Sequence, residues 1–519
     1  MKYLRNINLN LLNKDLALIK SKDAIFYLFL FIYISISLYL CNILMIQIDE
    51  AFTLNTTGNS VLKVIDLSYY FEGQPPFYFI ILSLWRKIST DIFFARLLSL
   101  IFTLLSAFVL SKLLRLLFDK SYSKWIIVLF LLNPFTVWAG MEIRTYSLLL
   151  LLSTLTIYLF YLLYYSDKNK YKILFILICT IGIYTQYYFI FLLFSLSLII
   201  LIYKGWRSFI NYYLMLIPVA LLVLPNLFFI KEQFEMHQNN QIYYTFLERL
   251  KSILYTPKHF IFPTGQILIA RVGRLILMLL ITGIIFSTVY FFLNEKSEKT
   301  TRDSSVLIQI LLLIALLLLI FLILFSFTNL IFHIKYLTII FPLFCLLFSS
   351  LSIYRIGLKN VIFVFFAVLY SLALFSTYKS PFIKTFNPKS LAYFIEKIEK
   401  PHETILFHEK SLVLIIKPYY KGNNPLIPLP NSVFDYNYFR DNIQDTIELD
   451  KLIKNAVNNS KSFILINGTD LGFVAKNPMS NKMFDKYIRN NYLISIDTII
   501  EGINTDCFLR ARRLSKKNS

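Results

Sequence analysis

Two adjacent carboxylates, Asp49 and Glu50, follow an apolar run that is long enough to cross a membrane. Carboxylates at such a helix exit lie on the water side of the interface, where they stay ionised at little cost and still reach a lipid headgroup. They are well placed for chemistry on a substrate carried by a lipid. The pair could instead only mark the end of the helix, so the rest of the chain has to decide between the two interpretations.

Further polar side chains lie in the loop after this pair and at the ends of later apolar runs, all on the side of the membrane to which we assign Asp49. An isolated charge beside an apolar helix costs free energy, so it is more often functional or paired than idle. The candidates are Glu72, Gln74, Glu142, Arg144, Tyr146, Gln186, Tyr187, His333 and Lys335.

Two of these candidates are cations suited to a phosphate. Arg144 sits just inside an apolar run, where its forked donors could hold a phosphate in a dry setting. It could instead pair with Glu142 or extend to the interface. Lys335 is the second candidate for a phosphate contact, and its alternative is a basic flank at a helix end. Gln186 and Tyr187 are weaker candidates, because interfacial aromatics usually form a structural belt.

The composition is that of an integral membrane protein. Hydrophobic residues make up 57% of the 519 residues and charged residues only 16%. Lys and Arg number 52 against 30 Asp and Glu, but much of the excess lies in short loops between apolar runs, so we expect it to orient helices and not to bind nucleic acid. The four cysteines have no paired spacing, which argues against a disulfide framework or a zinc site.

We predict a first span that is retained and enters from the cytoplasm, since its apolar run is too long for a signal-peptide core. Basic loops then alternate with aromatic and polar ones, and the basic loops are placed in the cytoplasm. Eleven crossings result, and they put the C-terminus outside. The predicted spans are 24–46, 92–114, 125–140, 145–165, 172–186, 188–203, 208–230, 266–293, 305–327, 336–353 and 361–377.

The apolar segment 77–88 is too short to cross a membrane. If it did cross, every later basic loop would face outward. The segment begins after Pro75-Pro76 and ends in Trp85-Arg86-Lys87, a composition that suits an interface. We therefore predict a juxtamembrane or re-entrant helix.

The composition changes abruptly after about residue 378, to Pro, Asn, Lys and Asp with short apolar runs. Residues 404–407 and 462–466 are predicted buried strands, whereas Asn387, 446–457 and 480–490 mark helices. Alternating strands and helices predict a small α/β domain outside the membrane. The predicted domains are 1–377, a membrane domain that includes the first outer loop 47–91, and 378–519, an extracytoplasmic α/β domain.

The order of these motifs resembles that of the GT-C glycosyltransferases, in the branch of the protein O-mannosyltransferases and the aminoarabinose transferases that modify lipid A. The resemblance spans roughly residues 20–350. Each motif is short, so the resemblance rests on the order of all the motifs together. The motifs are Asp49-Glu50, Tyr70-Phe71-Glu72-Gly73-Gln74-Pro75-Pro76-Phe77-Tyr78, Ala95-Arg96-Leu97-Leu98-Ser99, Glu142-Ile143-Arg144-Thr145-Tyr146, Tyr184-Thr185-Gln186-Tyr187 and Lys335-Tyr336 before Pro342.

The resemblance implies a polytopic helical fold in the plasma membrane and transfer of a sugar, with inversion, from a polyprenyl-phosphate donor to a lipid, protein or glycan acceptor at the extracytoplasmic face. It gives Asp49, paired with Glu50, the role of general base or metal ligand. It gives Glu72, with Gln74 and Glu142 beside it, the role of orienting acceptor or metal. Cations at the leaving phosphate stabilise its charge, which assigns Arg144 and Lys335 to the donor.

The sequence departs from the family pattern in three places. Gln74 and Gln186 stand where many relatives have His, and Lys335 stands where others have Arg. Without two histidines a firmly held transition metal is not expected, since carboxylates favour a hard, weakly bound divalent cation. We favour base catalysis without a metal.

Two other classes compete with the enzyme: a transporter or flippase for lipid-linked sugars, and a membrane protein of polysaccharide assembly. A transporter tends to place polar residues near the bilayer midplane and to have two related halves. Here the notable charges lie at outward helix ends and the halves differ, which favours the enzyme.

Overall fold

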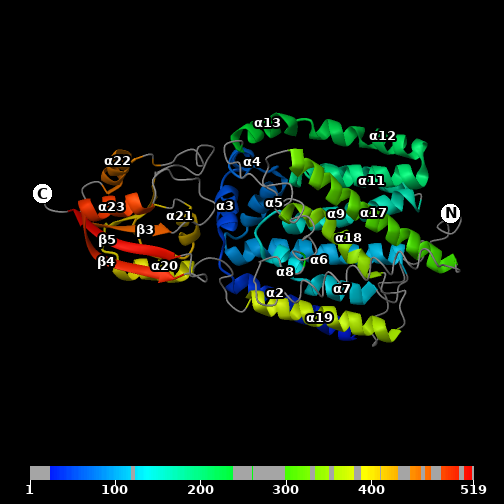
Figure 1. Cartoon of the computed structure of the whole chain (residues 1–519), viewed down its shortest axis with the longest axis horizontal. Helices are drawn as coiled ribbons and strands as arrows, with labels where there is room; N and C mark the ends of the chain where they lie inside the picture. The colour runs from blue at the N-terminus through cyan, green and yellow to red at the C-terminus, as the bar shows by residue number, and fades with distance from the viewer. Residues whose placement is uncertain are drawn as a thin grey trace. The chain divides into compact units, whose positions relative to one another are not determined.

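The computed structural model describes residues 24–118, 123–166, 168–237, 260, 298–327, 334–349, 356–378, 387–408, 411–429, 443, 445–457, 462–468, 481–501 and 508–516 (Figure 1). The chain divides into two compact units. The helical unit comprises residues 1–42 and 74–379, and the mixed unit comprises residues 43–73 and 380–519. The prediction assigns the whole first outer loop, 47–91, to the membrane domain, whereas the structure groups its first part with the C-terminal residues.

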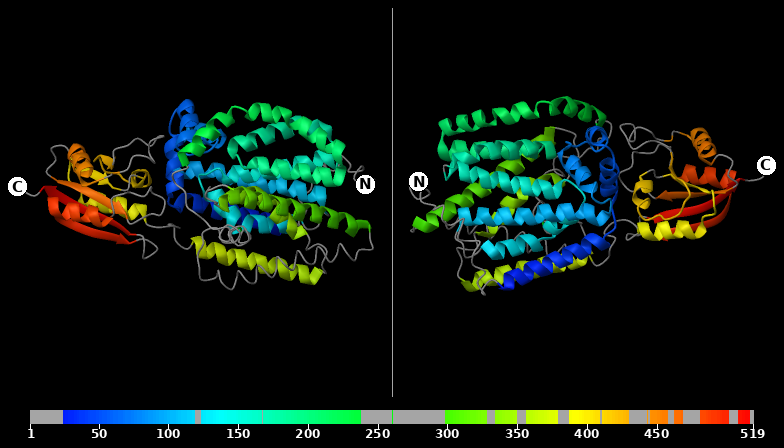
Figure 2. Two further views of the ribbon diagram at one scale, coloured as in Figure 1. Left: turned by 45° about the horizontal axis from the view of Figure 1, so that its top comes forward. Right: turned by 180° about the vertical axis from the view of Figure 1, so that it is seen from behind.

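Long apolar helices build the helical unit, and Figure 2 shows most of them running roughly side by side. Their sequences are rich in Leu, Ile and Phe, with few Gly or Pro to interrupt them. The elements are α2 (Ala24–Ile43), α5 (Phe77–Arg86), α6 (Ile92–Leu117), α7 (Ser123–Leu132), α8 (Pro134–Met141), α9 (Tyr146–Tyr164), η4 (Asn169–Tyr171), α10 (Lys172–Thr185), α11 (Phe189–Lys204), α12 (Trp206–Val223), α13 (Asn226–His237), α17 (Glu298–Phe327), η6 (Ile334–Ile340), α18 (Phe341–Leu347) and α19 (Ile356–Tyr378).

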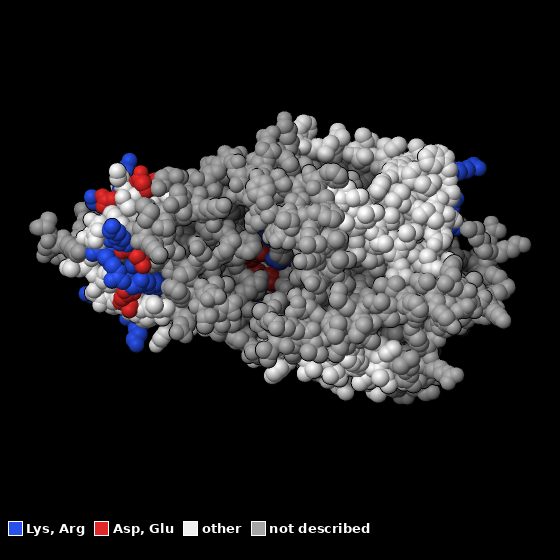
Figure 3. All heavy atoms as spheres, viewed as in Figure 1, with Lys and Arg blue, Asp and Glu red and all other residues white. Residues whose placement is uncertain are grey.

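Six helices among the described residues are long and apolar enough to cross a membrane: Ala24–Ile43, Ile92–Leu117, Tyr146–Tyr164, Trp206–Val223, Ser305–Leu324 and Asn360–Tyr378. The chain is therefore a multi-pass membrane protein. On the face drawn in Figure 3, the described surface across the broad middle of this unit carries no charged side chain, as a lipid-facing surface requires. Helix α9 is buried at almost every position and forms the centre of the unit.

The predicted span 125–140 consists of two helices, which are apolar enough together to form one broken span or a re-entrant loop. Helices α7 and α8 are bent by 60° at a break between Leu132 and Pro134. Pro134 cannot donate a backbone hydrogen bond to the preceding turn, and the Asn133 side chain accepts one from Phe135 N at 2.8 Å, which starts the new helix. A Cβ at Gly140 would lie 3.0 Å from Thr103 Oγ1, so α8 packs closely on α6.

Other predicted spans are shorter or divided. The predicted span 336–353 begins as the 3-10 helix η6 and continues as the short helix α18. The predicted span 208–230 is split into α12, which ends at Val223, two residues before Pro225, and α13. Helices α10 and α11 contain 14 and 16 residues. The predicted span 266–293 lies outside the described residues.

The predicted short helix after Pro75-Pro76 is confirmed as α5, which contains 10 residues. Its Trp85 stacks on Phe94 at the start of α6, with ring centroids 4.6 Å apart, and its indole N–H donates to the Phe94 carbonyl at 2.8 Å. This aromatic contact fixes α5 against the start of α6.

The mixed unit joins two short helices from the first loop, α3 (Ile48–Thr57) and α4 (Val61–Tyr70), to a C-terminal α/β fold. The five strands have the order β2-β1-β3-β5-β4; β1 is parallel to β2 and β3, and β5 is antiparallel to β3 and β4. The elements are α20 (Pro388–Ile398), β1 (Thr404–Phe407), α21 (Leu412–Ile416), β2 (Leu426–Pro428), α22 (Thr446–Val457), β3 (Ser462–Gly468), α23 (Asn481–Asn491), β4 (Tyr492–Glu501) and β5 (Phe508–Lys516).

The core of the α/β fold forms where α22 and α23 pack on the sheet, through Leu406, Leu449, Ile453, Phe463, Leu465, Phe484, Ile488 and Leu514. The predicted strands at 404–407 and 462–466 and the predicted helices are confirmed. The sequence does not predict β4 and β5. Strand β5 carries Arg510, Arg512 and Arg513, and so many charges are not expected in a strand that pairs on both sides. The structure nevertheless pairs it with both β3 and β4.

Candidate functional site

The two carboxylates of the first loop lie in the first turn of α3, but they have different roles. Glu50 is 1% exposed, and its Oε2 accepts a hydrogen bond from Gln47 N at 2.9 Å. This is the return bond of a capping box, so the Glu50 carboxylate holds the helix start. Asp49 is half-buried at the same helix N-terminus, where the helix dipole favours a negative charge.

Glu72 is held against the same helix. Its Oε1 accepts a hydrogen bond from the Thr56 hydroxyl at 3.2 Å, and its backbone N–H donates to Leu67 O at 2.9 Å. Asp49 and Thr56 lie on one face of α3, about two turns apart along the helix. Glu72 therefore contacts the face of α3 that carries Asp49, about two helical turns further along.

The α8–α9 connection carries the next predicted residues. Glu142 and Arg144 are 4% and 7% exposed. The Ser99 hydroxyl of α6 donates to the Glu142 carbonyl at 2.8 Å and fixes the connection.

A buried arginine that the sequence analysis did not select lies nearby. Arg96 of α6 is 1% exposed, and its Nη1 donates to the Cys41 carbonyl at 3.4 Å. Cys41 in turn contacts Met141, with the two sulfur atoms 3.7 Å apart. The end of α2, the first turns of α6 and the end of α8 therefore meet at one end of the helical unit. An arginine inside the predicted span 92–114 was the available signal for Arg96.

Lys335 lies over two aromatic rings. Its Nζ is 5.9 Å from the centre of the Trp138 ring and 5.5 Å from that of Tyr146, and these two rings stack with centroids 4.8 Å apart. Cation–π attraction holds an ammonium at such a place. The structure thus joins Lys335 to Tyr146 and adds Trp138, which the sequence analysis missed.

Gln186 and Tyr187 lie in the tight connection between α10 and α11. Gly182 makes it tight, because a Cβ there would overlap the Phe189 ring. The next residue, Tyr188, contacts Tyr336 with ring centroids 4.7 Å apart, and Tyr336 adjoins Lys335. This contact brings the Gln186 connection to the neighbourhood of Lys335.

Two predicted residues contribute less to the geometry. Gln74 Oε1 is buried and accepts no hydrogen bond from any residue that the structure describes. His333 lies outside the described residues. Of the predicted residues that the structure describes, Asp49, Glu50 and Glu72 belong to the mixed unit, and Gln74, Glu142, Arg144, Tyr146, Gln186, Tyr187 and Lys335 belong to the helical unit.

No group of three or more His, Cys, Asp or Glu side chains suited to a metal ion occurs among the described residues. The Glu50 carboxylate already bonds to Gln47 N, and Glu72 bonds to the Thr56 hydroxyl.

Residues 73–229, which include Glu142, Arg144 and Gln186, match the family model of dolichyl-phosphate-mannose-protein mannosyltransferase. The predicted resemblance is confirmed. No curated protein sequence matches the chain.

The fold agrees with that family match. The chain is similar to ArnT from Cupriavidus metallidurans in the apo state, with 12% identity, a TM-score of 0.60 and coverage of 95% of this chain and 98% of that one. It is also similar to the same protein bound to undecaprenyl phosphate, with 11% identity, a TM-score of 0.58 and coverage of 94% and 98%. The chain therefore has an ArnT-like fold over nearly its whole length. Archaeal oligosaccharyltransferase AglB from Archaeoglobus fulgidus, in complex with an inhibitory peptide and a dolichol-phosphate, matches at a TM-score of 0.42 and 12% identity, over 87% of this chain and 70% of that one.

Proposed function

We propose that the chain is a membrane glycosyltransferase that moves a sugar from a polyprenyl-phosphate-linked donor to an acceptor at the extracytoplasmic face. The family match across residues 73–229 carries the proposal, and it covers the buried Glu142–Arg144 connection. The ArnT-like fold supports it, since ArnT itself has been seen with undecaprenyl phosphate.

The helical unit is the donor side in this proposal. Arg144 is nearly buried, and Lys335 is held above Trp138 and Tyr146. When the bond from the sugar to the phosphate breaks, its electron pair leaves with the phosphate. Two fixed cations stabilise that charge, and no proton has to be supplied.

Asp49 is the base in this proposal. It takes the proton of the acceptor hydroxyl while the oxygen attacks the anomeric carbon opposite the phosphate, which inverts the configuration. We assign this role to Asp49 and not to Glu50, because the Glu50 carboxylate caps α3. Glu72, held against Thr56 on the same helix, orients the acceptor.

The residues that make up the mixed unit support the predicted membrane topology, in which the first loop and the C-terminal fold are both extracytoplasmic. The loop at 43–73 and the C-terminal residues from 380 belong to one compact unit, which supports a location on the same side of the membrane. An even number of crossings must therefore separate them. The predicted topology satisfies this condition, because ten of its eleven spans follow the first loop, and it puts both segments outside.

The proposal is tested with purified protein, labelled polyprenyl-phosphate sugars and candidate lipid, protein and glycan acceptors. Asp49→Asn is expected to lower turnover by at least about 100-fold, because general-base catalysis contributes about that much, while donor binding is retained. Chelation of divalent cations is expected to leave wild-type turnover unchanged. Full turnover by Asp49→Asn would remove Asp49 from the mechanism.

A further inference from the structure

A tyrosine of the C-terminal α/β fold holds the backbone just before the helix that carries Asp49. The Tyr419 hydroxyl accepts a hydrogen bond from Ile46 N at 2.9 Å. Ile46 is 4% exposed and directly precedes Gln47, the N-cap of α3. A buried backbone N–H that loses its partner costs free energy, so this bond fixes where α3 begins.

Tyr419 is itself held from two sides. Its backbone N–H donates to Ile416 O at 2.9 Å, which ties it to the end of α21, and α21 packs against α3. On α20, the Lys389 ammonium lies 5.7 Å from the centre of the Tyr419 ring. The phenol therefore extends from a fixed place in the fold.

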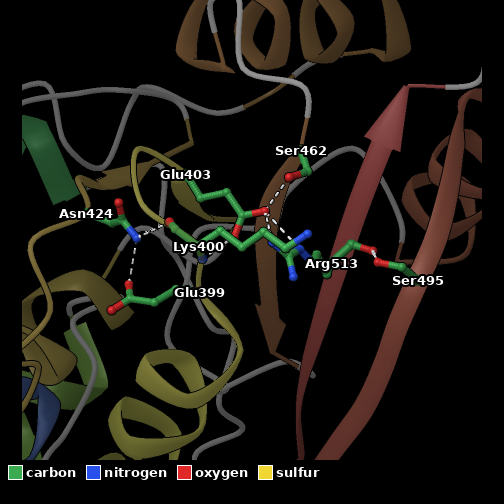
Figure 4. A network of polar contacts seen from close by, with 7 residues as sticks. All are labelled: Glu399, Lys400, Glu403, Asn424, Ser462, Ser495 and Arg513. Atoms are coloured by element: carbon green, nitrogen blue, oxygen red, sulfur yellow. Dashed lines mark hydrogen bonds and ion pairs between the residues drawn. The ribbon is translucent and has the colours of Figure 1, made fainter.

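The loop after Tyr419 is fastened to α20 and the turn that follows it. Lys421 N donates to Glu396 at 2.7 Å, and the Asn424 amide donates to Glu399 and to the Lys400 carbonyl at 2.9 Å each (Figure 4). The Tyr420 hydroxyl also donates to Glu399. These bonds hold the segment that presents Tyr419.

Gly422 lets this loop lie close to α20. A Cβ at this position would overlap the Glu399 carboxylate and the Tyr420 hydroxyl. The loop is therefore packed against α20 as tightly as a glycine allows.

We infer that Tyr419 is a positioning residue for Asp49: the α/β fold sets the start of α3 through the Tyr419–Ile46 bond and so places the base. The inference rests on the proposed role of Asp49. It gives the C-terminal fold a part in the transfer step, although none of its residues has to touch the sugar.

The first test needs no variant. Hydrogen exchange of the full-length protein in detergent is followed by mass spectrometry over residues 44–49. The Ile46 amide is expected to exchange slowly. Exchange as fast as that of an exposed amide would overturn the inference.

The second test compares two tyrosines of the α/β fold. Tyr419→Phe keeps the ring and removes the acceptor for Ile46 N. The control Tyr487→Phe removes a hydroxyl that donates to Asp450 at 2.5 Å on α22. Tyr419→Phe is expected to speed exchange at Ile46 and to lower kcat about tenfold, since small misplacements of a catalytic group cost this much or more, with donor KM unchanged. Tyr487→Phe is expected to change none of these.

The outcomes separate the two proposals. If Asp49→Asn abolishes turnover while kcat of Tyr419→Phe stays within about twofold of wild type, the positioning role is wrong and the proposed function stands. If Asp49→Asn keeps full turnover, the proposed function of Asp49 fails, and the exchange rate of Ile46 still reports whether the bond forms. Equal loss of kcat in Tyr419→Phe and Tyr487→Phe would show a general effect of destabilisation and would overturn the inference.

Discussion

The two units bury charge in different ways. In the mixed unit, Glu403 and Arg513 are paired: the guanidinium donates to Glu403 Oε1 at 2.8 and 2.6 Å, the Ser462 hydroxyl donates to the same oxygen, and Lys400 N donates to Oε2 at 2.8 Å (Figure 4). In the helical unit, Lys335 lies over aromatic rings and Arg96 bonds to a backbone carbonyl.

A buried ion pair with every oxygen bonded stabilises one arrangement of strands and leaves nothing to offer a ligand. Cation–π attraction, by contrast, leaves the charge of the ammonium group in place. The comparison assigns stability to the paired charges of the α/β fold, and under the proposed function we assign the donor phosphate to Arg144 and Lys335.

The largest expected effect is on the stability of the α/β fold. Glu403→Gln leaves the Arg513 side chain, 11% exposed, without its charged partner, which is expected to destabilise the fold by about 3–5 kcal/mol. Hydrogen exchange of the β3 and β5 amides in full-length protein measures the loss. Donor binding is expected to stay unchanged, and a weaker donor affinity with normal exchange would break the comparison.

A matched control is the exposed pair on α22. Lys454 lies 2.5 Å from Asp450, but its side chain is 62% exposed, so water already solvates it. Lys454→Met is expected to leave exchange of β3 and β5 unchanged.

Stability should also depend on pH through His408. Burial, first, and then the nearby Arg512 charge lower the pKa of His408 from 6.5 to about 4, against the opposing effect of Asp485. The unfolded chain therefore binds the proton more readily than the folded chain. Neutral, buried His408 contributes its full share to the free energy of unfolding above about pH 6.5, and this share is lost as the pH falls toward 4. We expect a loss of about 2 kcal/mol in the α/β fold over this range, somewhat less than the full shift implies because water reaches part of the ring.

His408→Gln is the variant that tests this sign. It is expected to weaken the pH dependence of hydrogen exchange in the α/β fold between about pH 6.5 and 4. The dependence that remains is expected from carboxylates such as Asp497, whose pKa is lowered by its hydrogen bonds with Arg510. An unchanged slope would place the titrating group elsewhere.

The smallest expected effect is at the aromatic rings beneath Lys335. Trp138→Leu removes one of the two rings and is expected to raise donor KM about fivefold, the equivalent of about 1 kcal/mol. Trp138→Phe, which keeps an aromatic face, is expected to restore most of the affinity. Trp125→Leu is the control, because that ring is 53% exposed and contacts Phe363. Equal effects of Trp138→Leu and Trp125→Leu would contradict the cation–π role.

Several features could be predicted because one physical constraint dominated each. The length of segment 77–88 excluded a crossing, and α5 is a short helix as expected. The bend between α7 and α8 had a signal in Asn133-Pro134, but the continuous apolar run concealed it. Strand β5 was missed because its arginines are matched by Glu403, Asp485 and Asp497, which come from other elements of the sheet and helices.

The site was predictable by residue type but not by role. Sequence alone could not separate Asp49 from Glu50, because the distinction is a single bond from Gln47 N to Glu50. Trp138 and Tyr419 were missed because aromatic residues are common throughout the chain, and only their contacts with Lys335 and Ile46 distinguish these two.

The proposed roles, in which Asp49 acts as the base and Arg144 binds the donor phosphate, are tested most directly by equilibrium binding of undecaprenyl phosphate to two variants. Arg144→Gln is expected to weaken binding by about 100-fold, the typical cost of losing one buried charge-assisted contact, whereas Asp49→Asn is expected to bind as tightly as wild type and to lack turnover. Tight binding by Arg144→Gln together with weak binding by Asp49→Asn would contradict the account.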